Sequence, residues 1–458
     1  MPTALALDPN APPHADLDRL AAIAQEVIAR CRGRGADQVE VGVSVDSGLA
    51  VNVRLGEVET VEHTRDRGLS LTVYRGQRKG AASTADLAED SIAVTIEQAL
   101  AIARHTEADP AAGLADPALY ASDFPDLDLW HPQAPDAPAA VALALRCESA
   151  ALDFDPRIRN SEGAGVNSGR SYGVYANSLG FLGREYGTRH SLSCSVLAGE
   201  DEAMERDYHY DSARAMADLA DATAIGREAA RRTLMRLGAR TLATRKAPAI
   251  LSAELARGFF GHLTSAVAGG AQYRKASFLL DAVGQRVFPD WVRIGEQPHL
   301  RRAAGSSNYD DDGVATRASM LIEDGVLARY ILGSYSARKL GLASTGNAGG
   351  VHNLVVQANA GSLAELFAEM REGLYVTEFL GQGVSTITGD YSRGAAGYWI
   401  ENGQVAYPVS EITVAGNLRE MYANLVAVGN EVDPRGNVRT GPVWLREVTV
   451  AGDGGSNE

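Results

Sequence analysis

Residues 39–55 read VEVGVSVDSGLAVNVRL, and apolar side chains occupy alternate positions through most of this stretch. Because successive side chains of a strand point to opposite faces of its sheet, this alternation predicts half-buried β-strands. We expect two strands here, Val39–Val45 and Leu49–Leu55. The N-terminal region can be interpreted outward from them.

Helical patterns flank these strands. The residues that recur at helical spacing before them are Leu17, Leu20, Ala24, Val27, Ile28 and Cys31, and the segment GRGAD closes that helix. After them, Leu69–Tyr74 and Gly80–Thr84 are predicted to pair around the polar turn 75–79. Asp86 then resembles the cap of a second helix, whose apolar face carries Leu87, Ile92, Ile96 and Leu100. The order of elements predicts an α+β N-terminal domain over residues 1–125.

The middle of the chain begins with a linker. Residues 106–138 are rich in Pro, Ala and Asp. They are followed by a predicted helix over 139–152, a Gly/Ser/Tyr-rich β segment with a turn at 177–180, and a long helix predicted over 212–237. We interpret 126–243 as a middle α/β domain.

The C-terminal part begins at the strand-like Ala249–Leu251. Predicted helices at 254–268 and 363–372 are set among many short strands punctuated by glycine. This pattern predicts a β-rich, barrel-like domain over 244–453, which makes the whole chain α+β. Residues 454–458 are expected to be frayed.

The composition excludes several classes of function. The 458 residues carry 43 Lys and Arg against 58 Asp and Glu, a net charge of −15, which argues against nucleic-acid or anionic-membrane partners. The three cysteines form no CxxC pair, so neither a disulfide framework nor a Cys-rich zinc site is predicted. The first residues lack the basic segment and apolar run of a signal peptide, and no stretch matches a membrane-spanning helix. We therefore expect a cytoplasmic protein.

The chain shows no complete catalytic metal site. Zinc hydrolysis needs three clustered ligands and an open position for water, yet none of the nine histidines lies in an HExxH pattern. We predict no metal or other cofactor in this chain. Residues 308–313 (NYDDDG) resemble the start of a calcium loop, but Ser319 stands where the bidentate glutamate should be, and a polar β-turn is the better interpretation.

Two further patterns leave alternatives open. Ser336 and Lys339 have the SxxK spacing in which a lysine can activate a serine, but no companion motif is present, and they could equally anchor a helical turn. The glycine-rich stretches 344–350 and 381–394 match no phosphate-binding pattern. They are compatible with a cleft in which an extended peptide lies along strand edges, or with tight hairpins.

Long blocks of the C-terminal half resemble the PmbA/TldE branch of the TldD/PmbA family, historically called modulators of DNA gyrase and classed as peptidases. The blocks are FFGHLTSAVAGGAQYRKASFLLD (259–281), SYSARKLGLASTGNAGGVHN (334–353), TEFLGQGVSTITGDYSRGAAGYWIENG (377–403) and YPVSEITVAGNL (407–418). The resemblance covers nearly the whole chain and is strongest from about residue 258 to 430.

In this family the catalytic paralogue, TldD, carries an HExxxH helix and a later cysteine that hold zinc. The resemblance places Arg257 at the first histidine, Gly258 at the glutamate and His262 at the last histidine, and no cysteine follows Cys194. Two metal ligands and the general base are therefore missing. Because five residues turn a helix by about 140°, positions 257 and 262 are not expected to share a face.

The resemblance implies a heterodimer in which a TldD-type partner supplies zinc for proteolysis of unfolded or leader peptides, while this chain shapes the cleft. When isolated, the chain could also form a homodimer. One alternative is a self-sufficient peptidase with a noncanonical metal site or Ser336–Lys339 chemistry. Another is a binding protein that modulates gyrase or a toxin–antitoxin pair without proteolysis. The residues predicted to contact substrate or the partner are His262, Tyr335, Arg338, Asn347, His352, Gln382, Tyr391 and Arg393.

Overall fold

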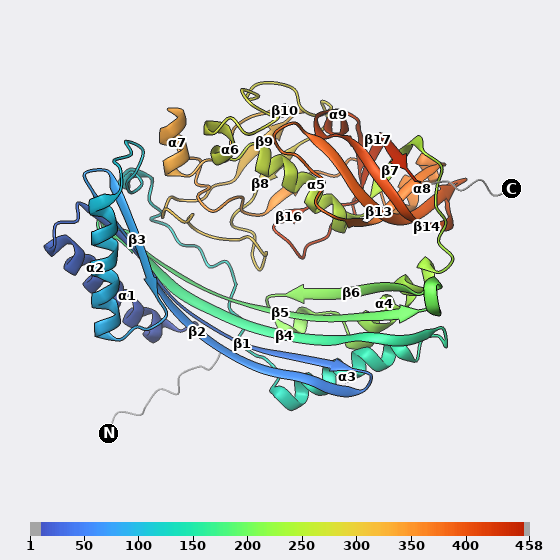
Figure 1. Ribbon diagram of the computed structural model, residues 1–458, viewed down its shortest axis with the longest axis horizontal. Helices are drawn as coiled ribbons and strands as arrows, with labels where there is room; N and C mark the ends of the chain where they lie inside the picture. The colour runs from blue at the N-terminus through green and yellow to red at the C-terminus, as the bar shows by residue number, and fades with distance from the viewer. Residues whose placement is uncertain (1–10, 453–458) are drawn as a thin grey trace. The chain divides into compact units, whose positions relative to one another are not determined.

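Strand β1 (Gln38–Arg54) runs without a break through the stretch where two strands were expected, in a computed structural model that describes residues 11–452 (Figure 1). The expected break is wrong because Gly48 stays in register, opposite Thr64 on one side and Gly169 on the other. A Cβ atom added to Gly48 would lie 3.2 Å from the carbonyl oxygen of Ser168. Glycine here marks a close approach between strands and not a turn.

The chain folds into two units. Among the described residues, the first comprises 11–197 together with Asp207–Arg231 and Asn308–Ala315, and the second comprises Ala198–Arg206, Arg232–Ser307 and 316–452.

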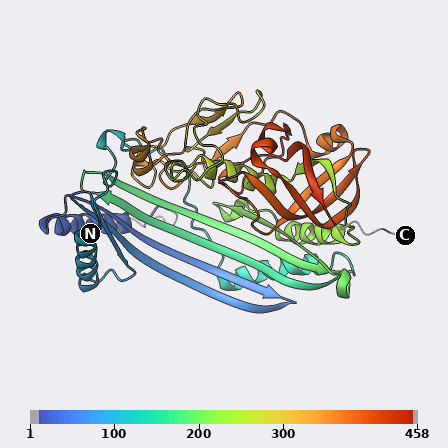
Figure 2. The ribbon, with the colours of Figure 1, turned by 45° about the horizontal axis from the view of Figure 1, so that its top comes forward.

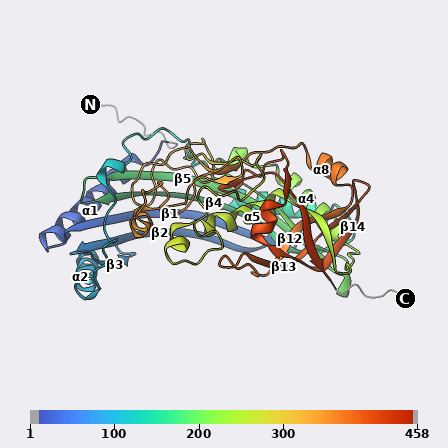
Figure 3. The same cartoon turned by 90° about the horizontal axis from the view of Figure 1, so that it is seen from above.

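The first unit is built on one six-stranded sheet with the order β3-β2-β1-β4-β5-β6. Its other strands are β2 (Glu57–Arg75), β3 (Arg78–Thr84), β4 (Ile158–Asn177), β5 (Leu182–Ala198) and β6 (Glu205–Ala213). Strand β1 pairs antiparallel with both β2 and β4. The four longest strands lie side by side along a gentle curve (Figures 2 and 3).

Helices cover the two ends of this sheet. Near one end lie α1 (His14–Gly33) and α2 (Glu89–His105), and near the other lies α3 (Ala137–Leu152) (Figure 1). The alternating valines Val39, Val41 and Val43 are buried against α1 and α2. All three helices were predicted, but Ala88 and not Asp86 is the N-cap of α2. The 106–138 linker contains a short 3-10 turn, Pro117–Leu119, before α3 begins at Ala137.

The long helix predicted over 212–237 is wrong in its first part. Strand β6 continues to Ala213, and helix α4 (Ala222–Arg236) begins only after Asp221. The carboxylate of Asp221 accepts hydrogen bonds from the backbone N–H groups of Thr223 and Ala224, at 2.9 and 3.3 Å. This side-chain cap satisfies the free N–H groups at the helix start and so fixes its position.

The calcium-like segment is a turn, as predicted. The N–H group of Gly313 donates to the carbonyl oxygen of Asp310 at 2.8 Å, and the Asp310 carboxylate accepts from the N–H groups of Asp312 and Val314. The carboxylate of Asp310 is therefore used to close its own loop.

The second unit contains a closed β-barrel, which confirms the barrel-like prediction. Strands β14, β13, β12, β7 and β17 pair in this order, and an additional β14–β17 pairing closes the ring, while β15 pairs with β17 outside it. Their bounds are β7 (Arg245–Leu251), β12 (Gly373–Leu380), β13 (Asp390–Glu401), β14 (Gln404–Asn417), β15 (Leu425–Val428) and β17 (Val443–Ala451).

A second sheet in this unit has the order β10-β9-β8-β11-β16. Its strands are β8 (Ile294–Glu296), β9 (Ser319–Glu323), β10 (Val326–Leu327), β11 (Leu354–Val356) and β16 (Val438–Arg439). The helices are α5 (Ala253–Ala266), α6 (Gly269–Tyr273), α7 (Ser334–Leu340), α8 (Leu363–Met370) and α9 (Leu418–Ala423). Tyr422 is fully buried in the core of this unit, where its hydroxyl donates to the carbonyl oxygen of Phe259.

Within residues 11–452, no helix has the length and apolar character needed to cross a membrane. The division into domains 1–125, 126–243 and 244–453 stays a prediction, and the pairing of β1 with β4 places strands from the first two in one sheet. The frayed tail predicted for 454–458 lies outside the described residues.

Candidate functional site

Helix α5 carries the positions that the family resemblance aligns with the catalytic motif. Ser252 caps the helix by accepting a hydrogen bond from the N–H group of Leu255, and Phe259, Phe260 and Leu263 form its buried face. Arg257 and His262 lie outside that face, each half-buried. Their surroundings decide what the helix can bind.

Arg257 belongs to a network of ion pairs. Its guanidinium lies 3.4 Å from the carboxylate of Asp433, whose side chain is 5% exposed. Arg435 donates to both oxygens of that carboxylate at 2.8 and 2.9 Å and also reaches Glu254, in the first turn of α5, at 3.3 Å. Burial alone would raise the pKa of Asp433, but the hydrogen bonds from Arg435 and the charge of Arg257 lower it. A cation thus occupies the place of the first motif histidine and is held by a buried anion.

His262 faces a different set of residues. Its ring meets the ring of Tyr391 on β13 edge to face, with the centroids 5.9 Å apart, and Tyr391 in turn meets Phe379 on β12 at 5.7 Å. Arg393 lies over the Phe379 ring and donates from Nε to the carbonyl oxygen of Gly381. Burial, and then the charge of Arg393, lower the pKa of His262, and burial raises the pKa of Tyr391 to about 12.

The imidazole of His262 is therefore neutral near pH 7, and it lies beside aromatic rings and the charged Arg393. A neutral imidazole can both donate and accept a hydrogen bond, as the binding of a peptide group requires. Three predicted site residues, His262, Tyr391 and Arg393, meet in this group. As the helical rotation predicts, His262 and Arg257 contact different elements, so the two positions do not converge on one point.

Asn347 and His352 belong to a second group around Glu296, which is 2% exposed at the end of β8. The carboxylate accepts from Asn347 Nδ2 at 2.8 Å, from the His352 backbone N–H group, and from Arg329. Burial would raise the pKa of Glu296, but the hydrogen bonds from His352 and the charge of Arg329 lower it. The Asn347 amide also binds Gly350 and Arg329, so this network holds the 344–353 loop in place.

Tyr335 and Arg338 are both exposed on α7. The ring of Tyr335 packs edge to face on Tyr273 and lies 5.4 Å from the ammonium group of Lys339. The hydroxyl of Ser336 donates to the carbonyl oxygen of Gly333 at 3.1 Å, a local hydrogen bond to the backbone of its own turn.

Gln382 lies exposed in the loop between β12 and β13, near the exposed Leu380 and Ile387. A Cβ atom added to the neighbouring Gly383 would lie 1.9 Å from the carbonyl oxygen of Ser392. This glycine therefore serves a close approach between the loop and β13. The eight predicted residues fall into separate groups within the second unit, and their contact with substrate or partner stays a prediction.

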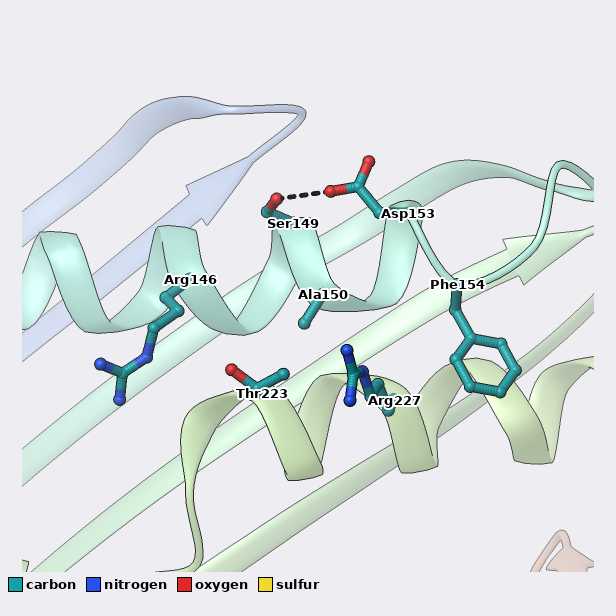
Figure 4. A pocket seen from close by; sticks show the side chains of 7 residues that line it. All are labelled: Arg146, Ser149, Ala150, Asp153, Phe154, Thr223 and Arg227. Carbon is teal, nitrogen blue, oxygen red and sulfur yellow. Dashed lines mark hydrogen bonds between the residues drawn. The ribbon is translucent and has the colours of Figure 1, made fainter.

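The first unit holds an open pocket of about 530 Å³ between α3 and α4 (Figure 4). Arg146 and Arg227 reach into the space between the helices, beside Ala150 and Thr223, while Asp153 is bound to Ser149. Arg146 pairs with Asp221 at 3.4 Å. The lining consists mainly of solvated charged and polar side chains with one exposed aromatic ring, Phe154.

The residues of the second unit do not fit a zinc site of the family type. Position 257 carries a guanidinium and position 258 has no side chain, so His262 stands alone. The cysteines Cys31, Cys147 and Cys194 are buried in the first unit. Among the described residues, no group of three His, Cys, Asp or Glu side chains is arranged to hold a metal ion. Glu254, Asp433 and Arg435 were not predicted from the sequence, because Glu254 is far along the chain from the other two and the three form no motif.

Three family models match the chain in order. They describe domain 1 (residues 39–103), the central domain (130–237) and the C-terminal domain (244–452) of PmbA/TldA metallopeptidases. The fold, a long sheet followed by a five-stranded barrel, is thus that of a metallopeptidase class. The chain belongs to the PmbA/TldD family.

Named relatives agree. The chain is 51% identical to the metalloprotease PmbA of Escherichia coli O157:H7, over 91% of this chain and 93% of that protein. It is 46% identical to a PmbA homologue of Haemophilus influenzae, over 90% and 92% of the two chains, and 26% identical to the TldD homologue of the same organism, over 53% and 55%.

Solved structures share the fold. A Bacteroides thetaiotaomicron protein named as a modulator of DNA gyrase superposes with a TM-score of 0.91 at 29% identity, covering 95% of this chain and 99% of that one. TldE from Thermococcus kodakarensis gives a TM-score of 0.83 at 20% identity, covering 94% and 100%.

Proposed function

We propose that this chain is the subunit of a two-chain peptidase that holds no metal itself and shapes the cleft for unfolded or leader peptides. A TldD-type partner would carry the zinc and perform the hydrolysis in the cytoplasm. The single observation that carries the proposal is the state of α5, where Arg257 is held by buried Asp433, Gly258 offers no base, and His262 contacts Tyr391 instead.

The surroundings of His262 support a role in peptide binding. The imidazole is neutral, half-buried and flanked by the Tyr391 and Phe379 rings, next to the loop that carries the exposed Leu380 and Ile387. Such a mixture of apolar surface with a few polar groups is typical of sites that bind extended ligands. We assign His262, Tyr391 and Arg393 to contact with substrate or partner.

The test is to express the chain alone and together with the TldD-type paralogue of its organism. Alone, it should contain no stoichiometric zinc by elemental analysis and should not cleave a fluorogenic unstructured peptide. With the paralogue, it should copurify, and cleavage should exceed that of the paralogue alone. Zinc-dependent cleavage by the isolated chain would overturn the proposal.

The Ser336–Lys339 alternative is separated in the same assay. If the isolated chain cleaves the peptide in the presence of a chelator and loses activity on Ser336→Ala, the serine mechanism holds and the metal-free subunit does not.

A further inference from the structure

Two long segments of the second unit contain no acidic residue. Asp and Glu make up about one in eight residues of the whole chain, yet residues 255–280 and 325–364 carry none. At the average frequency, two segments of this combined length would hold about eight carboxylates. In a chain with a net charge of −15, the cations of these segments therefore have no acidic neighbours along their own stretch of sequence.

The segments carry six Arg and Lys residues, and two of these are used inside the fold. Arg257 pairs with Asp433, and Arg329 pairs with Glu296. The other four are exposed on or beside helices α6 and α7, and they include two of the four lysines of the chain: Arg274, Lys275, Arg338 and Lys339. Positive charge is thus concentrated on two neighbouring helices of a strongly acidic protein.

Helices α6 and α7 pack closely against each other (Figure 1). The N–H group of Gly269, at the start of α6, donates to the carbonyl oxygen of Ile331 at 2.8 Å. A Cβ atom added to Gly269 would lie 2.3 Å from the hydroxyl oxygen of Ser336 on α7. Glycine permits this close approach, which brings the aromatic and basic side chains of the two helices together.

Two aromatic rings lie between two cations across these helices. The rings of Tyr273 and Tyr335 meet edge to face with their centroids 5.9 Å apart. The guanidinium of Arg274 lies 5.3 Å from the centroid of the Tyr273 ring, and the ammonium group of Lys339 lies 5.4 Å from that of Tyr335. We call these four residues the α6–α7 surface. Because each cation already rests on a ring, it loses less freedom when it binds an anion.

The α6–α7 surface suits an anion that also carries apolar groups. Tyr335 is 40% exposed, and Leu342, just beyond the end of α7, is 51% exposed. Arg and aromatic side chains are enriched where proteins bind other polypeptides. A peptide with scattered acidic and apolar side chains matches both features. A uniform polyanion such as a nucleic acid does not, because the net charge of −15 repels it.

From these observations we infer that the α6–α7 surface binds acidic segments of extended peptides. Carboxylates of the peptide pair with Arg274 and Lys339, and its apolar side chains lie on the tyrosine rings. The inference rests on the proposed function and narrows it, since unfolded peptides rich in Asp and Glu are then the preferred substrates.

The test measures binding to the isolated chain, so that it does not depend on cleavage. The probe is an unstructured peptide of about twelve residues with Glu at alternate positions, which lie on one side of an extended chain. It carries a neutral fluorophore, and binding is followed by anisotropy. At low salt the Glu peptide should bind about tenfold more tightly than its Gln counterpart, and raised salt should remove the difference. Equal affinities, or tighter binding of an oligothymidylate of equal charge, would overturn the inference.

Variants show whether the α6–α7 surface is the site. Arg274→Gln/Lys339→Gln should weaken binding of the Glu peptide by roughly three- to thirtyfold, as for the loss of two exposed ion pairs. Arg274→Lys/Lys339→Arg keeps both charges and should retain binding. The matched control, Lys246→Gln/Arg293→Gln, removes the same charge from exposed ion pairs elsewhere in the second unit and should leave binding unchanged. Full binding by the first variant, or an equal loss in either of the other two, would overturn the inference.

Cleavage in the presence of the TldD-type paralogue separates this inference from the proposed function. If the isolated chain prefers the Glu peptide but the two chains together cleave neither peptide, the proposed function fails and the acidic-peptide surface remains. If the two chains cleave both peptides equally well and the isolated chain shows no preference in binding, the inference fails and the proposed function remains.

Discussion

The Arg257 guanidinium lies 3.4 Å from the Asp433 carboxylate, which is itself gripped at both oxygens by Arg435. An isolated guanidinium at this partly buried position would be costly, and Asp433 offsets its charge. The pair therefore stabilises the second unit, and it also puts a cation where the family's metal site has a histidine.

Replacing Asp433 by Asn leaves two partly buried cations without their shared anion. We expect Asp433→Asn to lower the free energy of unfolding by about 2–4 kcal/mol, toward the lower side of the range for a broken buried pair because both arginines retain some contact with water. Equilibrium urea unfolding measures this. Glu447→Gln, which removes an exposed partner of Lys246, is the control and should change stability by less than about 1 kcal/mol.

Glu296 should make the stability of the second unit depend on pH in the acidic range. Its pKa in the folded chain lies below the ordinary value of 4.5, so its contribution to stability is complete above that value and is lost as the pH falls through the lowered pKa. Glu296→Gln should be less stable than the wild type at pH 7 and should lose less stability between pH 5 and 3. Thermal unfolding across that range tests it, and parallel wild-type and variant curves would contradict it.

The imidazole of His262 should stay neutral at pH values at which an ordinary histidine becomes protonated. Histidine NMR titration, with His262→Gln to assign the signal, should show a pKa below 6.5. Arg393→Gln should raise this pKa only in part, because burial is the larger cause and the guanidinium charge the smaller one. A pKa at or above 6.5 in the wild type would contradict the proposal that the His262 imidazole is neutral.

Placing the family's histidine and glutamate at positions 257 and 258 of α5 should not create a zinc site. Gly258 has no neighbouring atom within 4 Å of an added Cβ, so Arg257→His/Gly258→Glu should fold. It should still bind no stoichiometric zinc by isothermal titration and elemental analysis, because position 257 faces Asp433 while His262 faces Tyr391, and all three cysteines of the chain belong to the first unit. Stoichiometric zinc in this variant would show that α5 alone sets the metal content.

Glu148 should fix the β1–β2 turn. Glu148→Ala removes the two carboxylate oxygens that accept from the N–H groups of Leu55 and Gly56. It should lower the free energy of unfolding by about 1–3 kcal/mol, as for other buried groups left unsatisfied. Amide exchange should accelerate first at residues 55–62. Glu162→Ala, which removes an exposed acceptor of Ser195, is the control.

The sequence predicts those elements of this fold that have one buried face. Helices α1 and α5 and the alternating valines of β1 follow from periodicity. The first half of β2 was missed because residues 57–67 are exposed on both faces, and alternation arises only where one face is buried. The segment 214–221 has helix-favouring composition, yet it follows directly on strand β6 and the Asp221 cap starts helix α4 only after it.

The candidate site divides in the same way. Tyr391 and Arg393 lie beside His262 as residues of one strand reaching one helix, and the family resemblance pointed to all three. The partners of Arg257 lie far along the chain, where spacing carries no information about contact. Glu296 was missed because a lone buried carboxylate has no sequence signature, although it organises two residues that were predicted.

The barrel closes through its last strand. β17 (Val443–Ala451) lies between β7 and β15 and also pairs with β14, so the ring cannot form before residue 451 is available. During synthesis the first unit's sheet can assemble while the second unit still waits for its final segment. A chain that ends before Val443 should therefore be digested rapidly by protease in residues 316–442. Completion of the barrel therefore requires completion of the chain, and we expect unfinished chains to be more exposed to degradation.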